Sequence, residues 1–268
     1  MKIFEFSFNP KADGDRVRKL LHKQERVFLL GEIERPLPRD RKLLDEIFET
    51  AEGAYHPRFS TSKAQVKSAL KKTNQFLARQ QQQGNIDWLG HLHCFLLFLD
   101  PTRKKSVPLY AAGLGNIRMF LVRNKRLTEI QKIDTKAQMV APHAFGSMIS
   151  GTLIPGDKLF LFTKDLAQAL LKEKMLQQSM LFEKETNFQN FFKGKRSHFA
   201  KSSGLLTVII IPALANGAAA TPAILRRKLS LSLPSSLLSL HLNITKNQLL
   251  ILLFLLLLGV GFVLFRLL

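Results

Sequence analysis

The sequence contains a single cysteine, Cys94, among its 268 residues. One thiol cannot form an intrachain disulfide, and it cannot supply the several thiolates of a structural zinc cluster. A domain stabilised by disulfides is therefore excluded. We expect the bulk of the chain to be intracellular.

Acidic residues are scarce, because 20 Asp and Glu stand against 40 Lys and Arg and leave a net charge of +20. Such a charge attracts phosphates, nucleic acid or an anionic membrane surface, but it says nothing about the fold. The apolar content of 46% supports a buried core, and the length fits one domain of about 200 residues with accessory segments. A fibrous, collagen-like or wholly disordered chain is excluded.

Charge is absent from residues 249–265, which read LLILLFLLLLGVGFVLF. About 20 apolar helical residues span the ~30 Å hydrocarbon core of a bilayer, and a soluble helix would keep a polar face. We predict a single-pass transmembrane anchor at residues 247–268. Basic residues at 226–228 and Lys246 precede it and only Arg266 follows, which predicts a cytoplasmic location for the bulk of the chain. Residues 212–246, with Pro, Ala and Ser tracts, are expected to be a linker.

The spacing of apolar residues predicts the helices and strands of the first 211 residues. Apolar residues at intervals of three and four predict helices at about 43–51, 63–77 and 166–175. Ser60, Thr61 and Ser62 are candidate caps of the second helix. Gly113-Leu-Gly115 is expected to be a hairpin turn in an antiparallel meander. The order of helices and strands along the chain, in which helices are grouped and do not alternate strictly with strands, predicts a mixed α+β fold. Strands are predicted at 27–30, 93–99, 108–112, 117–122, 127–130, 158–162 and 206–211.

Smaller patterns leave alternatives open. His91 and His93 share one face of a predicted strand and either chelate a metal or are ordinary polar-face residues, which we favour because no third ligand is evident. Residues 191–201 mix basic residues with phenylalanine, as in a surface for single-stranded nucleic acid or, as we favour, a flexible basic loop. Trp88 is expected to be a core or interface anchor.

Several segments, in this order, resemble those of the PPM-type (type 2C) metal-dependent protein phosphatases. Residues 109–122, LYAAGLGNIRMFLV, resemble the family's "ANVGDSRAYL", and residues 153–166, LIPGDKLFLFTKDL, resemble "LxPGDxLLLCSDGL". Residues 27–33, VFLLGEI, fall where "LFAVADG" belongs, and residues 206–211, LTVIII, resemble the closing "DNxTVVVV". The resemblance implies a PPM phosphatase-like domain at residues 1–211, with two packed antiparallel β-sheets flanked by helix pairs.

The resemblance also implies two Mg²⁺ or Mn²⁺ ions held by aspartates, because hard divalent cations prefer oxygen ligands. The sequence departs from that pattern at three places. The family's "DG" is Glu32-Ile33, its "SDG" is Thr163-Lys164-Asp165, and its closing "DN" is Gly204-Leu205. Lys164 thus replaces a metal ligand, and Asp165 is displaced by one position, which at a strand end means the opposite face.

If a reduced metal site survives, its predicted ligands are Asp15, Glu32 and Asp165, with Asp15 supplied by the match of Asp13-Gly-Asp15 to the family's "NED". Lys164 and Arg118, the latter retained from "GDSR", are candidate contacts for phosphate or another anion. No cofactor is expected otherwise, and Mg²⁺ or Mn²⁺ is expected only if the chain is active.

The lost carboxylates predict a membrane-anchored, catalytically inactive PPM phosphatase-like domain that acts as a binding or scaffolding module. Two alternatives stay open: a divergent Mg/Mn-dependent Ser/Thr protein phosphatase, and a basic membrane-surface module that binds nucleic acid or anionic lipid. The expected partners are the membrane, through residues 247–268, and a phosphoprotein or another cytoplasmic protein. Nucleic acid is not expected.

Overall fold

The computed structural model of the chain describes residues 1–9, 16–55, 62–103, 105–131, 144–172, 174–199 and 202–213. The chain divides into a compact unit, Met1–Ala215, and a second unit, Asn216–Leu268. The predicted anchor at 247–268 and nearly all of the predicted linker at 212–246 lie outside the described residues. Within the described ranges, no helix is long and apolar enough to cross a bilayer.

Ten strands of the described residues form two five-stranded sheets, in which every pair of neighbours is antiparallel. The strands are β1 (Lys2–Phe8), β2 (Arg16–Lys23), β3 (Val27–Glu34), β4 (Leu92–Leu99), β5 (Val107–Leu114), β6 (Arg118–Arg123), β7 (Arg126–Gln131), β8 (Met148–Leu153), β9 (Lys158–Phe162) and β10 (Gly204–Ile210). One sheet has the order β2-β3-β4-β5-β8, and the other has the order β1-β10-β9-β6-β7.

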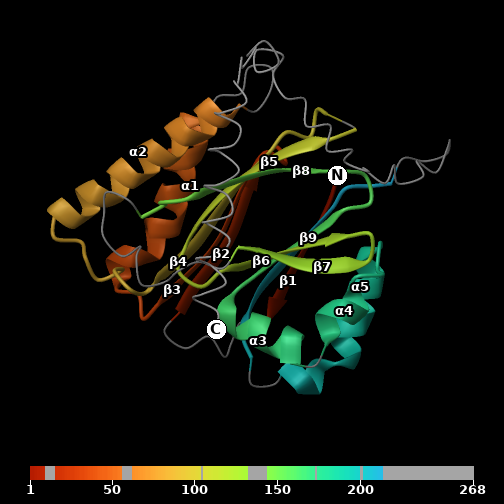
Figure 1. Cartoon of the computed structure of the whole chain (residues 1–268). Helices are drawn as coiled ribbons and strands as arrows, with labels where there is room; N and C mark the ends of the chain where they lie inside the picture. Colours follow the sequence, from red (N-terminus) through yellow and green to blue (C-terminus); the bar gives the residue numbers. More distant parts are fainter. Residues whose placement is uncertain are drawn as a thin grey trace, which may run out of the picture. The chain divides into compact units, whose positions relative to one another are not determined.

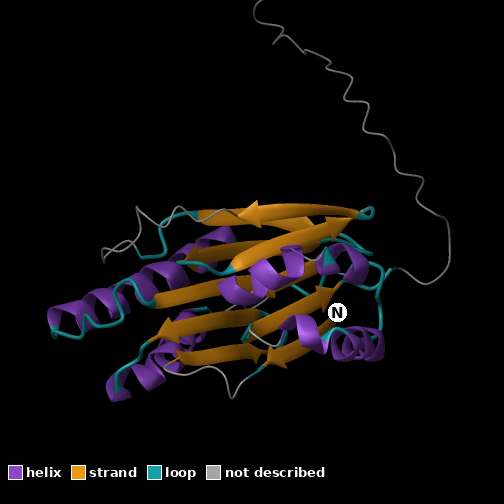
Figure 2. Ribbon diagram, turned by 90° about the horizontal axis from the view of Figure 1, so that it is seen from below, coloured by secondary structure: helices purple, strands orange, loops and turns teal. Residues whose placement is uncertain are grey.

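Helices flank the two sheets on their outer faces (Figures 1 and 2). The long helices α1 (Leu43–Ala54) and α2 (Lys63–Gln82) cover the first sheet, while α3 (Lys164–Lys172), α4 (Met175–Ser179) and α5 (Glu185–Gly194) lie by the second. The predicted pair of antiparallel sheets flanked by helices is confirmed, with three helices in place of a pair on the second sheet. Two short 3-10 helices, Pro38–Lys42 and Arg196–Phe199, complete the set of described helices.

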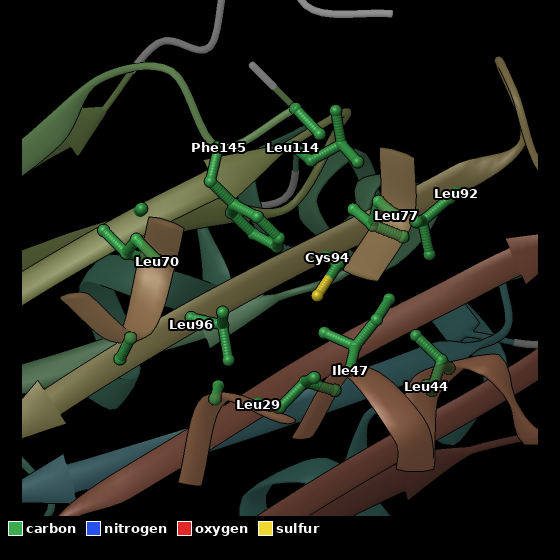
Figure 3. Packing of buried hydrophobic residues seen from close by; sticks show 14 of the residues in the cluster. Leu29, Leu44, Ile47, Leu70, Leu77, Leu92, Cys94, Leu96, Leu114 and Phe145 are labelled. Carbon is green, nitrogen blue, oxygen red and sulfur yellow. The ribbon is translucent and has the colours of Figure 1, made fainter. Parts of the chain in front are cut away.

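The core consists of three apolar layers, which the strands divide by alternation. On β3, Leu29 and Ile33 face helices α1 and α2, whereas Phe28 and Leu30 face the space between the sheets. Figure 3 shows Leu29 in the helix-side layer, near Ile47 of α1. Because β3 and β4 are buried on both faces, their sequences are continuous apolar runs rather than alternating ones.

The start of α2 follows the predicted capping pattern. The backbone N–H of Gln65 donates to Oγ of Ser62 at 3.3 Å, and the Ser62 N–H donates to Oε1 of Gln65 at 3.0 Å. This reciprocal arrangement satisfies two N–H groups that a helix start otherwise leaves without partners. Of the predicted cap candidates, Ser62 is the cap, while Ser60 and Thr61 lie outside the described residues.

The chain changes sheets between β5 and β6, so the predicted hairpin at Gly113-Leu-Gly115 is wrong. Strand β5 pairs with β4 and β8, whereas β6 pairs with β7 and β9 in the other sheet. Gly115 has a φ of +75°, a left-handed conformation that glycine adopts without steric cost. Turn residues indicate that the chain reverses, but they do not indicate in which sheet the next strand pairs.

The basic segment at 191–201 is not the flexible loop that we favoured, because α5 and a 3-10 helix occupy most of it. Phe192 and Phe199 are buried and contact Phe6 and Phe8 of β1, with ring centroids 5.3 and 4.8 Å apart respectively. These rings belong to the core, so they are not free to stack on nucleic-acid bases. Strand β1, which the sequence reading missed, supplies their partners.

An ion pair with a buried carboxylate, Arg123–Asp157, lies at the turn between β8 and β9. The Asp157 carboxylate accepts hydrogen bonds from Nε and Nη2 of Arg123, at 3.0 and 2.6 Å, and from the Ile154 N–H at 2.7 Å. Asp157 is buried, and the hydrogen bond from Arg123 is the main reason why the pKa of that guanidinium is raised. The pair holds the turn before β9 against β6.

We expect Asp157→Asn to lower the free energy of unfolding by about 1–3 kcal/mol, because it weakens the hydrogen bonds of the buried side chain to the Ile154 N–H and to the partly exposed Arg123 guanidinium. The check is urea unfolding of the full-length chain in non-ionic detergent, followed by the fluorescence of the buried Trp88. The control is Glu129→Gln, which breaks the Arg118–Glu129 pair, whose carboxylate is more exposed than that of Asp157, and should cost about 1 kcal/mol or less. Equal losses in the two variants would contradict the prediction.

Candidate active-site cluster

Charged side chains gather where the apolar space between the sheets ends. On β3, Glu32 continues the row of Phe28 and Leu30, and on β4 His93 continues the row of Phe95 and Leu97. Glu32 and His93 are also cross-strand partners, and both are buried. Alternation along the two strands therefore places a carboxylate and an imidazole side by side at the end of the sandwich.

Two arginines of β2 neutralise the carboxylates of this cluster. The β2–β3 register sets Arg16 opposite Glu34 and Arg18 opposite Glu32. Nε of Arg18 donates to Oε2 of Glu32, and both side chains are almost completely buried. Nη1 of Arg16 lies 3.6 Å from Oε1 of Glu32, and its Nη2 lies 3.7 Å from Oε1 of Glu34.

Arg16 also reaches the second sheet's side of the cluster, because its Nη1 donates to the Asp165 carboxylate. Burial lowers the pKa of Arg16, but the bond to Asp165 and the charges of Glu32, Asp165 and Glu34 outweigh it and raise that pKa. One permanently charged guanidinium thus lies among three carboxylates.

Asp165 reaches this cluster because it belongs to the first turn of α3, not to a strand end. The Thr163 carbonyl accepts the Ala167 N–H at 2.9 Å and so begins the helix. The expectation that a shift of one residue would turn Asp165 to the opposite face is therefore wrong, since strand alternation does not apply there. A carboxylate in the first turn also interacts favourably with the helix dipole.

The surroundings of His93 lower the pKa of its imidazole. Its Nδ1 accepts the Asn116 N–H at 3.3 Å, and its Nε2 lies 3.7 Å from Oε1 of Glu34. Burial is the main reason why the pKa of His93 is lowered; Glu34 and Glu32 oppose this effect, whereas Lys164 and Arg16 add to it. His93 is thus not an ordinary residue of a polar face, as we had favoured from the sequence.

Gly204, which stands where the family's closing "DN" begins, is packed closely against Thr163 and Leu166. A Cβ at Gly204 would lie 2.3 Å from Oγ1 of Thr163 and 2.9 Å from Cβ of Leu166. The Leu205 N–H meanwhile donates to that Thr163 hydroxyl at 3.3 Å. The close approach of β10 to the start of α3 therefore leaves no room for a carboxylate at residue 204.

The structure brings Glu32, Asp165 and Lys164 of the predicted residues to one place. Lys164 is exposed at the start of α3 and has no ion pair with a described residue, so its role as an anion contact stays a prediction. Asp15 lies outside the described residues. Arg118 lies elsewhere: it forms a bidentate pair with Glu129, at 2.8 and 2.7 Å, and covers the ring of Phe120 on the helix-covered face of the second sheet.

Sequence reasoning missed three members of the cluster, Arg16, Arg18 and Glu34. It also missed that His93 is buried. A signal was present: Arg16-Val-Arg18 and Glu32-Ile-Glu34 alternate with the same period and carry opposite charges. Two such segments flanking a turn predict a hairpin with complementary cross-strand pairs.

The described donors do not fit a pair of divalent ions as they are arranged. Glu32 is bound by Arg18 and faces Arg16, and Asp165 is bound by Arg16, so each carboxylate already meets a fixed positive charge. Across the residues that the structure describes, no group of three or more His, Cys, Asp or Glu side chains is arranged to hold a metal ion. A metal would have to displace a guanidinium from its carboxylates.

Comparison with known proteins finds no matching family model and no matching curated protein. Solved structures do match. PppA, described as a key regulatory component of T6SS in Pseudomonas aeruginosa, aligns with a TM-score of 0.55 and 13% identity over 78% of this chain and 96% of its own. The Mycobacterium tuberculosis serine/threonine phosphatase PstP aligns with a TM-score of 0.54 and 14% identity over 78% of this chain and 98% of its own.

The PPM Ser-Thr phosphatase MsPP of Mycobacterium smegmatis gives a TM-score of 0.52 and 10% identity over 78% of this chain and 98% of its own. The resemblance read from the sequence is confirmed at the level of fold: residues 1–213 adopt, in their described parts, the fold of PPM-type Ser/Thr phosphatases.

A first prediction from the cluster concerns pH. Because the pKa of His93 is lowered in the folded chain, the unfolded chain binds a proton below about pH 6.5 that the folded chain does not bind. Stability should therefore fall as the pH drops below about 6.5. In His93→Asn, whose Oδ1 can replace Nδ1 as an acceptor, the fall should be smaller. Urea unfolding at several pH values measures it, and an unchanged fall in the variant would show that another group binds the proton.

A second prediction concerns Gly204. We expect Gly204→Ala to lower the free energy of unfolding by about 1–3 kcal/mol, since its Cβ overlaps the Thr163 hydroxyl. The matched control is Gly151→Ala on β8, where nothing lies within 4 Å of the added Cβ and the change should stay within about 0.5 kcal/mol. Urea unfolding of both variants tests the prediction, which a stable Gly204→Ala would refute.

Proposed function

We propose that the chain is a membrane-anchored PPM phosphatase-like domain that does not hydrolyse phosphoesters and that works as a binding or scaffolding module. The observation that carries the proposal is the Arg16 guanidinium, which binds Asp165 and lies against Glu32. A guanidinium in that position offsets the negative charge that two adjacent divalent ions need. The loss of oxygen donors at Lys164 and Gly204 supports the same conclusion.

The membrane part of the proposal rests on residues 247–268, whose uncharged stretch has the length of a bilayer span. The basic residues before it favour a cytoplasmic location for the domain. A protein of this kind would hold its folded domain close to the membrane surface, where a phosphoprotein or another cytoplasmic protein could bind it.

A divergent Mg/Mn-dependent Ser/Thr phosphatase is the second candidate. It is favoured because three carboxylates, Glu32, Glu34 and Asp165, lie around the Arg16 side chain. PstP has been crystallised in complex with two manganese ions, in a structure that matches this chain with a TM-score of 0.54. In this case Arg16 would have to leave the cluster when metal binds.

The deciding experiment is a calorimetric titration of the full-length chain with Mn²⁺, in non-ionic detergent, with a p-nitrophenyl phosphate assay on the same sample. We expect no heat of binding at millimolar metal and no turnover. Arg16→Gln, which frees Glu32 and Asp165, should increase the affinity for Mn²⁺ because it removes a competing cation.

Tight binding of Mn²⁺ by the unmodified chain, with turnover that is lost in Glu32→Ala, would overturn the proposal. Since Glu32 is buried, Asp165→Asn serves as a second variant whose side chain is partly exposed and which should fold normally. Loss of turnover in both variants would establish a phosphatase.

A further inference from the structure

A groove lies on the helix side of the first sheet, between α2 and the chain that leads into β8. It has a volume of about 620 Å³ and is open to solvent. Its apolar lining comes from Leu70, Phe145 and Met148, and its rim carries Lys63, Lys67 and Lys71. The groove is separate from the Arg16 cluster, because α2 packs on the outer face of the sheet whereas Glu32 and His93 continue its inner face.

The walls of the groove are joined by a pair of hydrogen bonds. The Phe145 N–H donates to Oδ1 of Asn74 at 2.9 Å, and Nδ2 of Asn74 donates to the Phe145 carbonyl at 3.3 Å. Both Leu70 and Phe145 are largely buried, and Figure 3 shows them on the same side of the sheet as Leu96. The groove is therefore formed in the folded chain and does not depend on a bound partner.

The lysines of the rim follow one another at intervals of four residues, so they lie on one face of α2, about 6 Å apart along its axis. Helix α2 contains no acidic residue, and none of the three lysines forms an ion pair with a described residue. The acidic residues Asp45 and Glu52 of the neighbouring α1 instead pair with Lys19 and Lys23 of β2. Like charges at this spacing destabilise a helix slightly, by about 0.2–0.5 kcal/mol for each pair.

We propose that this groove binds an acidic peptide segment of a partner protein, with carboxylates or phosphates on the lysines and an apolar side chain against Leu70 and Met148. Alternate residues of an extended peptide repeat every ~6.6 Å, which is close to the interval of the lysines. The alternation of acidic and apolar residues in such a segment matches a rim of charge beside an apolar floor.

Two other polyanions fit less well. A membrane surface is broad, whereas this site is concave and apolar inside. Single-stranded nucleic acid needs exposed aromatic faces for stacking, but the Phe145 ring is buried. The inference does not require the loss of phosphatase activity, so the Mn²⁺ titration and the peptide experiment can fail independently.

The test measures fluorescence anisotropy of a fluorescein-labelled peptide, Glu-Phe-Glu-Leu-Glu-Phe-Glu, with the full-length chain in non-ionic detergent. We expect saturable binding that weakens with salt and is lost when every Glu of the peptide is replaced by Gln. The double variant Lys67→Glu, Lys71→Glu should weaken binding by about tenfold or more. The matched control is Lys72→Glu, an exposed lysine of the same helix outside the groove, which should change the affinity by less than about threefold.

Circular dichroism of each variant checks that the chain still folds. We expect it to fold, because Lys67, Lys71 and Lys72 are all exposed. A third variant, Met148→Ser, should weaken binding by about threefold to tenfold if the floor holds an apolar side chain. Absence of peptide binding, or equal weakening by Lys72→Glu and the double variant, would overturn the proposal. It would also be overturned if mixed micelles with phosphatidylserine, or an oligonucleotide, bound through these lysines while the peptide did not.

Discussion

The pairing of β2 arginines with β3 glutamates is the interaction on which the candidate site depends. Glu32 is buried at the end of the space between the sheets, and a carboxylate there needs a partner. Removing one member of a buried pair commonly costs roughly 3–5 kcal/mol. Since Arg16 and Arg18 face Glu34 and Glu32 across the ladder, a slip by one residue would turn both arginines to the wrong side. The pairs therefore specify the β2–β3 register as well as the charge of the site.

The remainder of the fold has an extensive apolar core of its own. Three apolar layers run through the sandwich, and the helices of the second sheet are fixed to it by a buried lysine. Nζ of Lys158 donates to the carbonyls of Met180 and Phe182, each at 2.7 Å, and burial lowers the pKa of this lysine. Within the described residues, most of the buried side chains are apolar, and the charged cluster lies at the end of the sandwich.

Much of this fold could be predicted from the sequence, because apolar runs such as those of β4, β9 and β10 depend on local composition. The missed strands are β1, β2 and β8, most of whose side chains are partly buried or exposed, so that they lack a continuous apolar signal. Helix α5, in the segment that we expected to be a basic loop, was missed as well. The site was predicted in part: Glu32 and Asp165 follow recognisable motifs, whereas Arg16 acts through a cross-strand register that no single segment encodes. The same limit explains Asp165, whose position depends on where a helix begins.

The distribution of charge gives the two faces of the first sheet different roles. On the inner face, the cations of β2 are matched by carboxylates, so that charge is balanced within the fold. On the outer face, no described acidic residue forms an ion pair with the lysines of α2, and Asp45 and Glu52 of α1 pair with Lys19 and Lys23 of β2 instead. Part of the net charge of +20 is concentrated on Lys63, Lys67 and Lys71, which form a row beside the apolar groove. The carboxylates of the inner cluster are neutralised by its own arginines, whereas no described carboxylate pairs with this outer row, so an external anion meets no such competitor there.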